Sequence, residues 1–253
     1  MKMTPTRPPG CIERLNGQQL YFAVYGTGQP LLLLHGFSGS SQDWIPSLEQ
    51  WGTRFQFILS DLRGHGRSGI LLTPFRHDDA ATDTFALLDH LGIRACKGVG
   101  ISAGGNVLLH MATRQPDRIT SMVLVSATPY FPVQARAIMS QYADNLPEAQ
   151  WEILRGRHPG GDAQIKAILA STQSFAASYD DLNFTPPLLS TIRARTFIIQ
   201  GDRDPLYPVE LSVEMCKAIP HSRLWIVPNA GHGPVLGARW PEFIQTASTF
   251  LEE

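Results

Sequence analysis

Short apolar runs bounded by glycine, proline or aspartate recur along the chain. Seven of them span four to seven residues and are rich in leucine, isoleucine, valine or phenylalanine. Runs of this length and composition are typical of buried β-strands. The pattern therefore predicts strands at Leu20–Tyr25, Leu31–Leu34, Phe55–Ser60, Ala95–Ile101, Ser121–Ser126, Thr196–Gln200 and Arg223–Val227.

Longer segments with helix-like patterns follow several of these runs. Asp78–Leu91 has leucines at i and i+3, Gly104–Arg114 follows a serine, and Pro208–Ile219 begins with a proline that suits the first turn of a helix. Arg239–Leu251 is a fourth such segment. Strands that alternate with helices predict an α/β fold, in which a largely parallel sheet is covered by helices on both faces.

The interval from 130 to 190 interrupts this alternation. It is rich in helix formers and aromatic residues, is broken by turns at His158–Gly161 and Pro186-Pro187, and has no convincing strand. We predict a helical cap at 130–190 inserted into a core domain of residues 1–129 and 191–253. Apolar periodicity cannot separate packing onto the core from a pocket wall. The candidate pocket residues are Tyr130, Phe131, Met139, Tyr142, Trp151 and Phe175.

Composition narrows the class of partner. The 253 residues are 43% hydrophobic and 17% charged, which suits one compact core with an insertion. Twenty-one basic and 22 acidic residues give a net charge of -1 without a basic cluster, so neither nucleic acid nor a membrane is expected as a partner. No apolar run reaches the roughly 18 residues of a membrane span, and a cytoplasmic location is expected. The three widely spaced cysteines predict no disulfide and no zinc site.

The stretch Val99–Gly105, "VGISAGG", places a serine between a predicted strand and a predicted helix. Gly-x-Ser-x-Gly in that context is the nucleophile elbow, a sharp turn that exposes the serine hydroxyl at the carboxyl end of the strand. The pentapeptide alone also occurs as an ordinary helix N-cap, and the flanking strand and helix favour the elbow. Ser102 is therefore the candidate nucleophile.

A serine nucleophile needs a histidine base and an acid. In folds that contain the elbow, the chain order is serine, then acid, then histidine. His232 follows the last predicted strand and lies at the same sheet edge as Ser102, whereas His221 precedes that strand. The segment "GDRD" offers Asp202 and Asp204 at this edge. We favour Asp204 as the acid, because Asp202 is better explained as a turn residue that accepts nearby amides.

An oxyanion requires two amide donors. The amide of Ala103 lies at a helix N-terminus, and the second donor is expected from the loop after Leu31–Leu34, which begins His35-Gly36-Phe37. The predicted pair is the backbone N–H groups of Phe37 and Ala103. His35 precedes the serine and is expected to brace this loop through a hydrogen bond.

Five motifs in order resemble those of the α/β-hydrolase superfamily: "LLLLHGF", "DLRGHGRS", "GISAGG", "GDRDPLYP" and "GHGP". The resemblance covers most of the core. It implies an eight-stranded sheet, a cap after the sixth strand, Ser102, Asp204 and His232 as a catalytic triad, and Phe37 and Ala103 as the oxyanion amides. It implies no metal and no organic cofactor. The loop "HGFSGSSQDW" also resembles the menaquinone-pathway synthase of this fold, but Asn106 stands where that enzyme has a basic residue.

The expected reaction is hydrolysis of a small carboxylic ester through an acyl-enzyme on Ser102. A short, apolar cap predicts short to medium acyl chains or small aromatic esters. Activity should rise through roughly pH 6 to 8 as a histidine base becomes neutral. A lactone or enol-lactone hydrolase and a carbon–carbon bond hydrolase would use the same triad. A small-molecule receptor without turnover is the alternative from another class.

Overall fold

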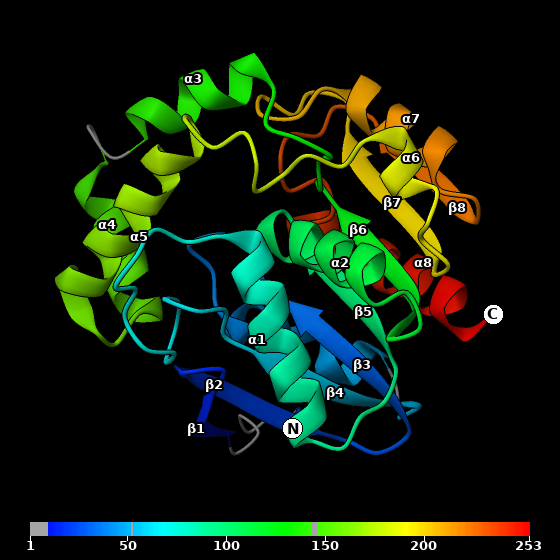
Figure 1. Ribbon diagram of the computed structural model, residues 1–253, viewed down its shortest axis with the longest axis horizontal. Helices are drawn as coiled ribbons and strands as arrows, with labels where there is room; N and C mark the ends of the chain where they lie inside the picture. Colours follow the sequence, from blue (N-terminus) through cyan, green and yellow to red (C-terminus); the bar gives the residue numbers. More distant parts are fainter. Residues whose placement is uncertain (1–9, 52, 143–145) are drawn as a thin grey trace.

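The computed structural model describes residues 10–51, 53–142 and 146–253 (Figure 1). Its centre is one eight-stranded sheet with the strand order β1-β2-β4-β3-β5-β6-β7-β8. The six strands from β3 to β8 run parallel, while β2 is antiparallel to both β1 and β4. The strands are β1 (Gly10–Leu15), β2 (Gln18–Tyr25), β3 (Gln29–Leu34), β4 (Phe55–Ser60), β5 (Cys96–Ile101), β6 (Ile119–Val125), β7 (Arg195–Gly201) and β8 (Ser222–Val227).

The seven strands predicted from apolar runs are present to within two residues at either end, which confirms the predicted α/β fold. The strand that the runs missed is β1, whose residues are almost all exposed. It forms an edge hairpin with β2 and therefore lacks a buried face that would leave an apolar pattern. Asn16 and Gly17 form the turn with φ values of 49° and 77°. Asn-Gly is a hairpin signal that could have revealed this strand.

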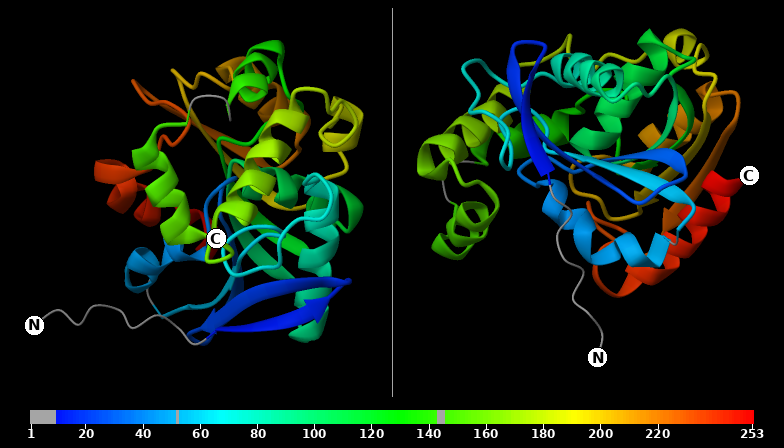
Figure 2. Two further views of the ribbon diagram at one scale, coloured as in Figure 1. Left: turned by 90° about the vertical axis from the view of Figure 1, so that its left-hand side faces the viewer. Right: turned by 90° about the horizontal axis from the view of Figure 1, so that it is seen from below.

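Alternate residues of the central strands enter two separate cores. Leu32 and Leu34 of β3 pack in the cluster that includes α1 (His77–His90), α2 (Ala103–Arg114) and α7 (Val209–Ala218). Leu31 and Leu33 pack in the other cluster, with the 3₁₀ segment η1 (Ser41–Trp51) and α8 (Trp240–Glu252). Figure 2 shows η1 and α8 on one side of the sheet and α1 and α2 on the other. Helices therefore cover both faces.

The segment 130–190, which we call the cap, lies between β6 and β7, and its described residues form four helices. They are α3 (Val133–Gln141), α4 (Glu148–Arg157), α5 (Gly161–Phe175) and α6 (Pro186–Leu189). In Figure 1, α3, α4 and α5 arch over the end of the sheet where the parallel strands finish. Residues 1–9 and 52 of the predicted core domain and residues 143–145 of the predicted cap lie outside the described ranges.

Candidate active site

Ser102 occupies a sharp turn between β5 and α2. Its φ and ψ of 51° and -115° are rarely adopted by a residue with a side chain. Two hydrogen bonds hold this conformation: the Ser102 amide donates to the Val125 carbonyl at 2.7 Å, and the Ser102 carbonyl accepts the Asn106 amide at 3.0 Å. The turn therefore begins the helix and holds the serine at the carboxyl end of the strand.

The glycines around Ser102 allow β5, α2 and the loop after β3 to approach one another closely. A Cβ atom on Gly100 would overlap the carbonyl group of Gly104. A Cβ atom on Gly104 would in turn overlap the backbone carbonyl of Leu34. Backbone in these positions cannot move aside cheaply, so the elbow depends on residues without side chains.

Ser102, His232 and Asp204 form one hydrogen-bonded row across three strand ends. His232 Nε2 lies 2.9 Å from Ser102 Oγ, and His232 Nδ1 lies 2.8 Å from Asp204 Oδ2. Ser102 follows β5, Asp204 follows β7 and His232 follows β8, so residues 130 positions apart in sequence meet at one sheet edge. With Nδ1 donating to Asp204, Nε2 is oriented to accept the Ser102 proton.

Asp204 is held as a carboxylate by several donors. Its side chain is fully buried, and Oδ1 accepts the amides of Leu206 at 2.8 Å and Tyr207 at 3.1 Å. The side-chain amide of Gln200 donates to Oδ2 at 2.9 Å. Burial opposes ionisation, but the hydrogen bond and charge of His232 and the two backbone amides outweigh it and lower the pKa of Asp204. Asp204 therefore stays ionised at neutral pH.

The competing residues that the sequence offered lie elsewhere. Asp202 Oδ1 accepts the amide of Ala230 at 3.1 Å, as expected of a turn residue. His221 directly precedes β8 and its carbonyl accepts the amide of Thr196 at the start of β7, so it lies at the opposite edge of the sheet.

A tight turn at Gly36–Gly39 lies beside the serine. The Gly39 amide donates to the Gly36 carbonyl at 3.0 Å, and Ser38 has a φ of 58°. Phe37 and Ala103 both line the cavity at Ser102, and no hydrogen bond within the described ranges uses either backbone amide. Two free amides beside an elbow serine can bind a negatively charged oxygen.

His35 braces this loop, as the sequence suggested. Its Nε2 accepts the Leu62 amide at 3.0 Å and its Nδ1 lies 2.7 Å from the Gly36 carbonyl. Burial lowers the pKa of His35, so the ring stays neutral and keeps both hydrogen bonds.

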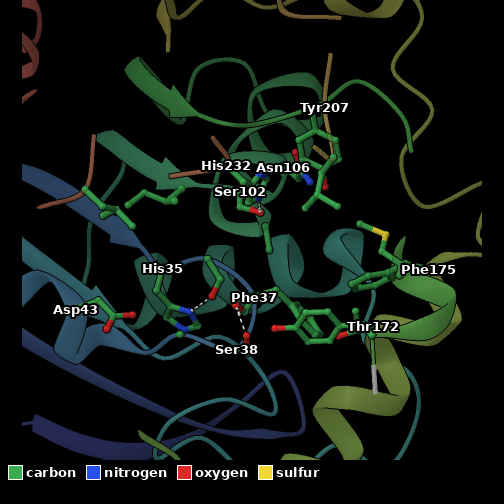
Figure 3. Close-up of a pocket in the computed structure, with 18 of the residues that line it drawn as sticks. His35, Phe37, Ser38, Asp43, Ser102, Asn106, Thr172, Phe175, Tyr207 and His232 are labelled. Carbon is green, nitrogen blue, oxygen red and sulfur yellow. Dashed lines mark hydrogen bonds between the residues drawn. The ribbon is translucent and has the colours of Figure 1, made fainter. Parts of the chain in front are cut away.

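A cavity of about 740 Å³ opens above Ser102 and His232. Figure 3 shows Ser102, His232, Asn106 and Tyr207 grouped at one end, with Phe37, Thr172 and Phe175 facing them. Its walls are mostly apolar and come from the loop 35–39, η1, the cap and the loops after β7 and β8. Its large apolar residues include Phe37, Trp44, Ile101, Phe131, Ile138, Met139, Tyr142, Phe175, Leu206, Tyr207, Leu236 and Trp240.

Four of the six candidate pocket residues line this cavity: Phe131, Met139, Tyr142 and Phe175. The structure places Tyr130 and Trp151 elsewhere, which corrects the prediction. Tyr130 forms an isolated β-bridge with Asn183 and is 39% exposed. Trp151 packs on a cluster of Leu154, Ile165 and Leu169 inside the cap. The Trp151 side chain packs towards α5 rather than the cavity, and periodicity alone cannot distinguish these two apolar neighbours.

Several cavity residues were not recognised from sequence as part of a pocket. Trp44 and Trp240 come from the far face of the sheet, and Tyr207 stacks edge-on against His232 with ring centroids 5.1 Å apart. Arg157 and Asp43 form an ion pair of 3.1 Å at the cavity. Of these residues, only Tyr207 could have been placed near the site from sequence, because it lies three residues after the predicted acid, Asp204.

A profile for proteins with the alpha/beta hydrolase fold matches residues 29–164, more than half of the 253 residues. The chain belongs to the α/β-hydrolase family. Within the described ranges of this hydrolase, no helix combines the length and apolar character that crossing a membrane requires.

Named relatives of this hydrolase cover several reactions. It is 28% identical over 249 residues to a non-heme haloperoxidase of Rhodococcus erythropolis, covering 86% of this chain and 90% of that protein. It is 28% identical over 255 residues to a pimeloyl-[acyl-carrier protein] methyl ester esterase of Chromobacterium violaceum, covering 92% and 98%. An enol-lactonase from Burkholderia xenovorans LB400 superposes with a TM-score of 0.78 at 21% identity, covering 96% of this chain and all of the other. That likeness shows the fold.

Proposed function

We propose that this hydrolase cleaves carboxylic esters with short to medium acyl chains or small aromatic groups, through an acyl-enzyme on Ser102. The observation that carries the proposal is the hydrogen-bonded row of Ser102, His232 and Asp204 at the wall of an apolar cavity. The similarity to a methyl ester esterase over nearly the whole chain supports an ester as substrate.

In the proposed mechanism His232 acts first as a base and then as an acid. His232 Nε2 takes the proton of Ser102 Oγ as that oxygen attacks the ester carbonyl. The amides of Phe37 and Ala103 bind the resulting oxyanion, and Asp204 stabilises the imidazolium. His232 then returns the proton to the leaving alcohol. A water, deprotonated by His232, attacks the acyl-enzyme and releases the carboxylic acid and free Ser102.

The size and chemistry of the cavity support a small substrate. A volume of about 740 Å³ lies within the range of small-molecule sites, roughly 300–1,000 Å³. Its aromatic walls suit an apolar or aromatic group. A lactone is a cyclic ester that would pass through the same acyl-enzyme, so lactones belong in the same test.

The test is hydrolysis of p-nitrophenyl esters from acetate to palmitate, together with simple lactones, by the wild type and Ser102→Ala. We expect kcat/KM to peak at short or medium chains and turnover to vanish in the variant. A peak at palmitate would contradict the cavity argument. Turnover that survives in Ser102→Ala would contradict the mechanism. No turnover of any ester or lactone, with Ser102 still labelled by a fluorophosphonate, would favour a different substrate class or a binding role.

A further inference from the structure

A second histidine–aspartate pair lies in the cavity wall, away from Ser102. His77 is the first residue of α1 and lines the cavity. Its ring packs among aromatic side chains, with centroids 5.1 Å from Phe75 and 5.2 Å from Phe175. Asp181 reaches it from the cap, where its carboxylate Oδ2 lies 2.7 Å from His77 Nδ1. Neither residue takes part in the proposed ester chemistry.

Asp181 is ionised and determines how the His77 ring is oriented. Besides His77 Nδ1, its carboxylate accepts the backbone amides of His77 at 2.9 Å and Asp78 at 3.2 Å, the first amides of α1. Burial opposes ionisation, but the hydrogen bond and charge of His77 and the two amides outweigh it and lower the pKa of Asp181 to about 2. A carboxylate at Nδ1 requires a hydrogen on that nitrogen.

The other ring nitrogen of His77 faces away from Asp181 and is unused. No hydrogen bond within the described ranges involves His77 Nε2, although the ring lines the cavity. The neighbouring His110 differs, because its Nε2 lies 2.7 Å from the Asp181 carbonyl oxygen. When Nδ1 alone carries a hydrogen, Nε2 is a hydrogen-bond acceptor, and the apolar wall around Phe75 and Phe175 then contains one oriented acceptor.

The hydrogen bond to Asp181 uses only one of the two ring nitrogens of His77. Asp181 also joins the cap to α1 through backbone amides, and any residue other than proline at position 77 would supply the first of these. The imidazole adds a polar ring at a position where an apolar side chain would complete the aromatic packing. Among the described residues, the fully buried polar atoms without a partner do not include His77 Nε2, so this nitrogen is accessible from the cavity. A ligand that displaces water from it loses affinity unless it donates a hydrogen bond in its place.

We infer that His77 Nε2 is a substrate-binding acceptor and that Asp181 is its positioning residue. The ligand class is an ester that carries a hydroxyl group, aliphatic or phenolic, on the group remote from the scissile bond. This inference rests on the proposed ester hydrolysis at Ser102. The hydroxyl donates to His77 Nε2 while the apolar part of the group packs against Phe131 and Phe175.

The test compares matched esters that differ by one hydroxyl. Methyl 4-hydroxyphenylacetate is compared with methyl phenylacetate, and 4-hydroxyphenethyl acetate with phenethyl acetate, so that the hydroxyl is placed once on the acyl side and once on the alcohol side. In one pair we expect kcat/KM of the wild type to be about tenfold higher for the hydroxylated ester, the discrimination typical of one buried hydrogen bond.

Three variants test the assignment to His77. His77→Phe should reduce that ratio to about one, and His77→Gln, whose amide oxygen can still accept, should retain part of it. Asp181→Asn should lower the ratio because the ring loses its fixed orientation. The control is His90→Gln, an exposed histidine at the other end of α1, which should keep the wild-type ratio. A ratio of one in both wild-type pairs, or a preference that persists in His77→Phe, would overturn the inference.

Two further measurements separate this inference from the proposed function. Methyl 4-carboxyphenylacetate tests the opposite polarity, and a preference for it over the hydroxyl ester would mean that His77 binds anions as a cation. Binding of each ester pair to Ser102→Ala, measured by calorimetry, does not depend on turnover. The inference is supported if Ser102→Ala binds the hydroxylated ester with a tenfold lower Kd than its partner ester and if this difference disappears in the double variant Ser102→Ala/His77→Phe. This result would hold even if the wild type hydrolyses neither ester. Equal Kd values would overturn it.

Discussion

Two regions of the molecule are built in different ways. At the carboxyl edge of the sheet, each of Ser102, Asp204 and His232 follows a strand directly or within a short loop. The contacts that join the cap to the core come instead from helices, helix ends and turns. The side chains of His158, Gln164, Ser171 and Asp181 make these contacts, which we call the cap–core seam. His158 Nδ1 accepts the Gly66 amide at 2.9 Å, and the side-chain amide of Gln164 donates to the carbonyls of Gly64 and Gly66, each at 3.0 Å. The partners are about 90 to 100 positions apart in sequence.

The two regions therefore depend on different parts of the molecule. At the sheet edge, backbone pairing between parallel strands determines where the three side chains meet. At the cap–core seam, individual side chains satisfy buried backbone groups of the core loop 64–78, which would otherwise be left without partners. We expect substitutions at the sheet edge to abolish chemistry with little loss of stability, and substitutions at the seam to lower stability first.

The largest expected effect is at the nucleophile. Ser102→Ala should lower kcat/KM for the best p-nitrophenyl ester by about 10⁵-fold or more, because the covalent step is lost. The measurement is esterase activity together with circular dichroism melting, which should show a folded protein. The matched control is Ser126→Ala, because Ser126 is a buried serine with a φ of 50° at the end of the adjacent strand β6 and outside the cavity. A similar loss in the control would mean that backbone strain, not the hydroxyl, matters.

The next effect separates the two candidate acids. Asp204→Asn should lower kcat about 10³–10⁴-fold, since an amide at this position no longer holds His232 in the correct tautomer or stabilises its charged form. Asp202→Asn keeps an oxygen that can accept the Ala230 amide, and its kcat should stay within about threefold of the wild type. Steady-state kinetics of both variants provide the comparison. Equal losses would contradict the assignment of Asp204.

A smaller effect tests the cap–core seam. Gln164→Ala removes the donor of two buried carbonyls and should lower the free energy of unfolding by about 1–3 kcal/mol, measured by urea denaturation. Gln245→Ala, at an exposed position of α8, is the control and should change this free energy by no more than about 0.5 kcal/mol. If Gln164→Ala and Gln245→Ala are equally stable, the seam contributes little and the cap is held by its apolar contacts.

A pH dependence of stability is a further test of the cap–core seam. Burial lowers the pKa of His158 to about 4, against about 6.5 in an unfolded chain. Between these values the unfolded chain binds the extra proton, so the free energy of unfolding rises with pH, by about 1.4 kcal/mol per pH unit for one such site. Urea denaturation from pH 4 to 7 should show a shallower slope for His158→Gln. The exposed His221→Gln should match the wild type, and an unchanged slope in His158→Gln would contradict the burial argument.

Residues whose environment depends on few neighbours could be predicted from sequence. The elbow at Ser102 is a local turn whose glycines are needed by the backbone, and a residue after a parallel strand must lie at the carboxyl edge of the sheet. Position relative to the last strand then favoured His232 over His221, and turn chemistry favoured Asp204 over Asp202. The edge strand β1 was missed because neither of its faces is buried, so its sequence shows no alternation of apolar and polar residues. Its turn was nevertheless marked by Asn16-Gly17.

The cavity wall was decided by tertiary structure. Apolar residues of the cap have several apolar surfaces to face, so the spacing that placed Phe131 and Phe175 in the candidate pocket also placed Tyr130 and Trp151 there. His77 carried no signal, because its role depends on Asp181, which lies 104 positions later and meets it only when the cap packs on α1. The sequence by itself determined seven strands of the sheet, the elbow and the order of the candidate reactive groups, since these follow from local geometry and strand direction. The lining of the cavity required the packed cap, since burial is a property of the neighbours that folding brings together.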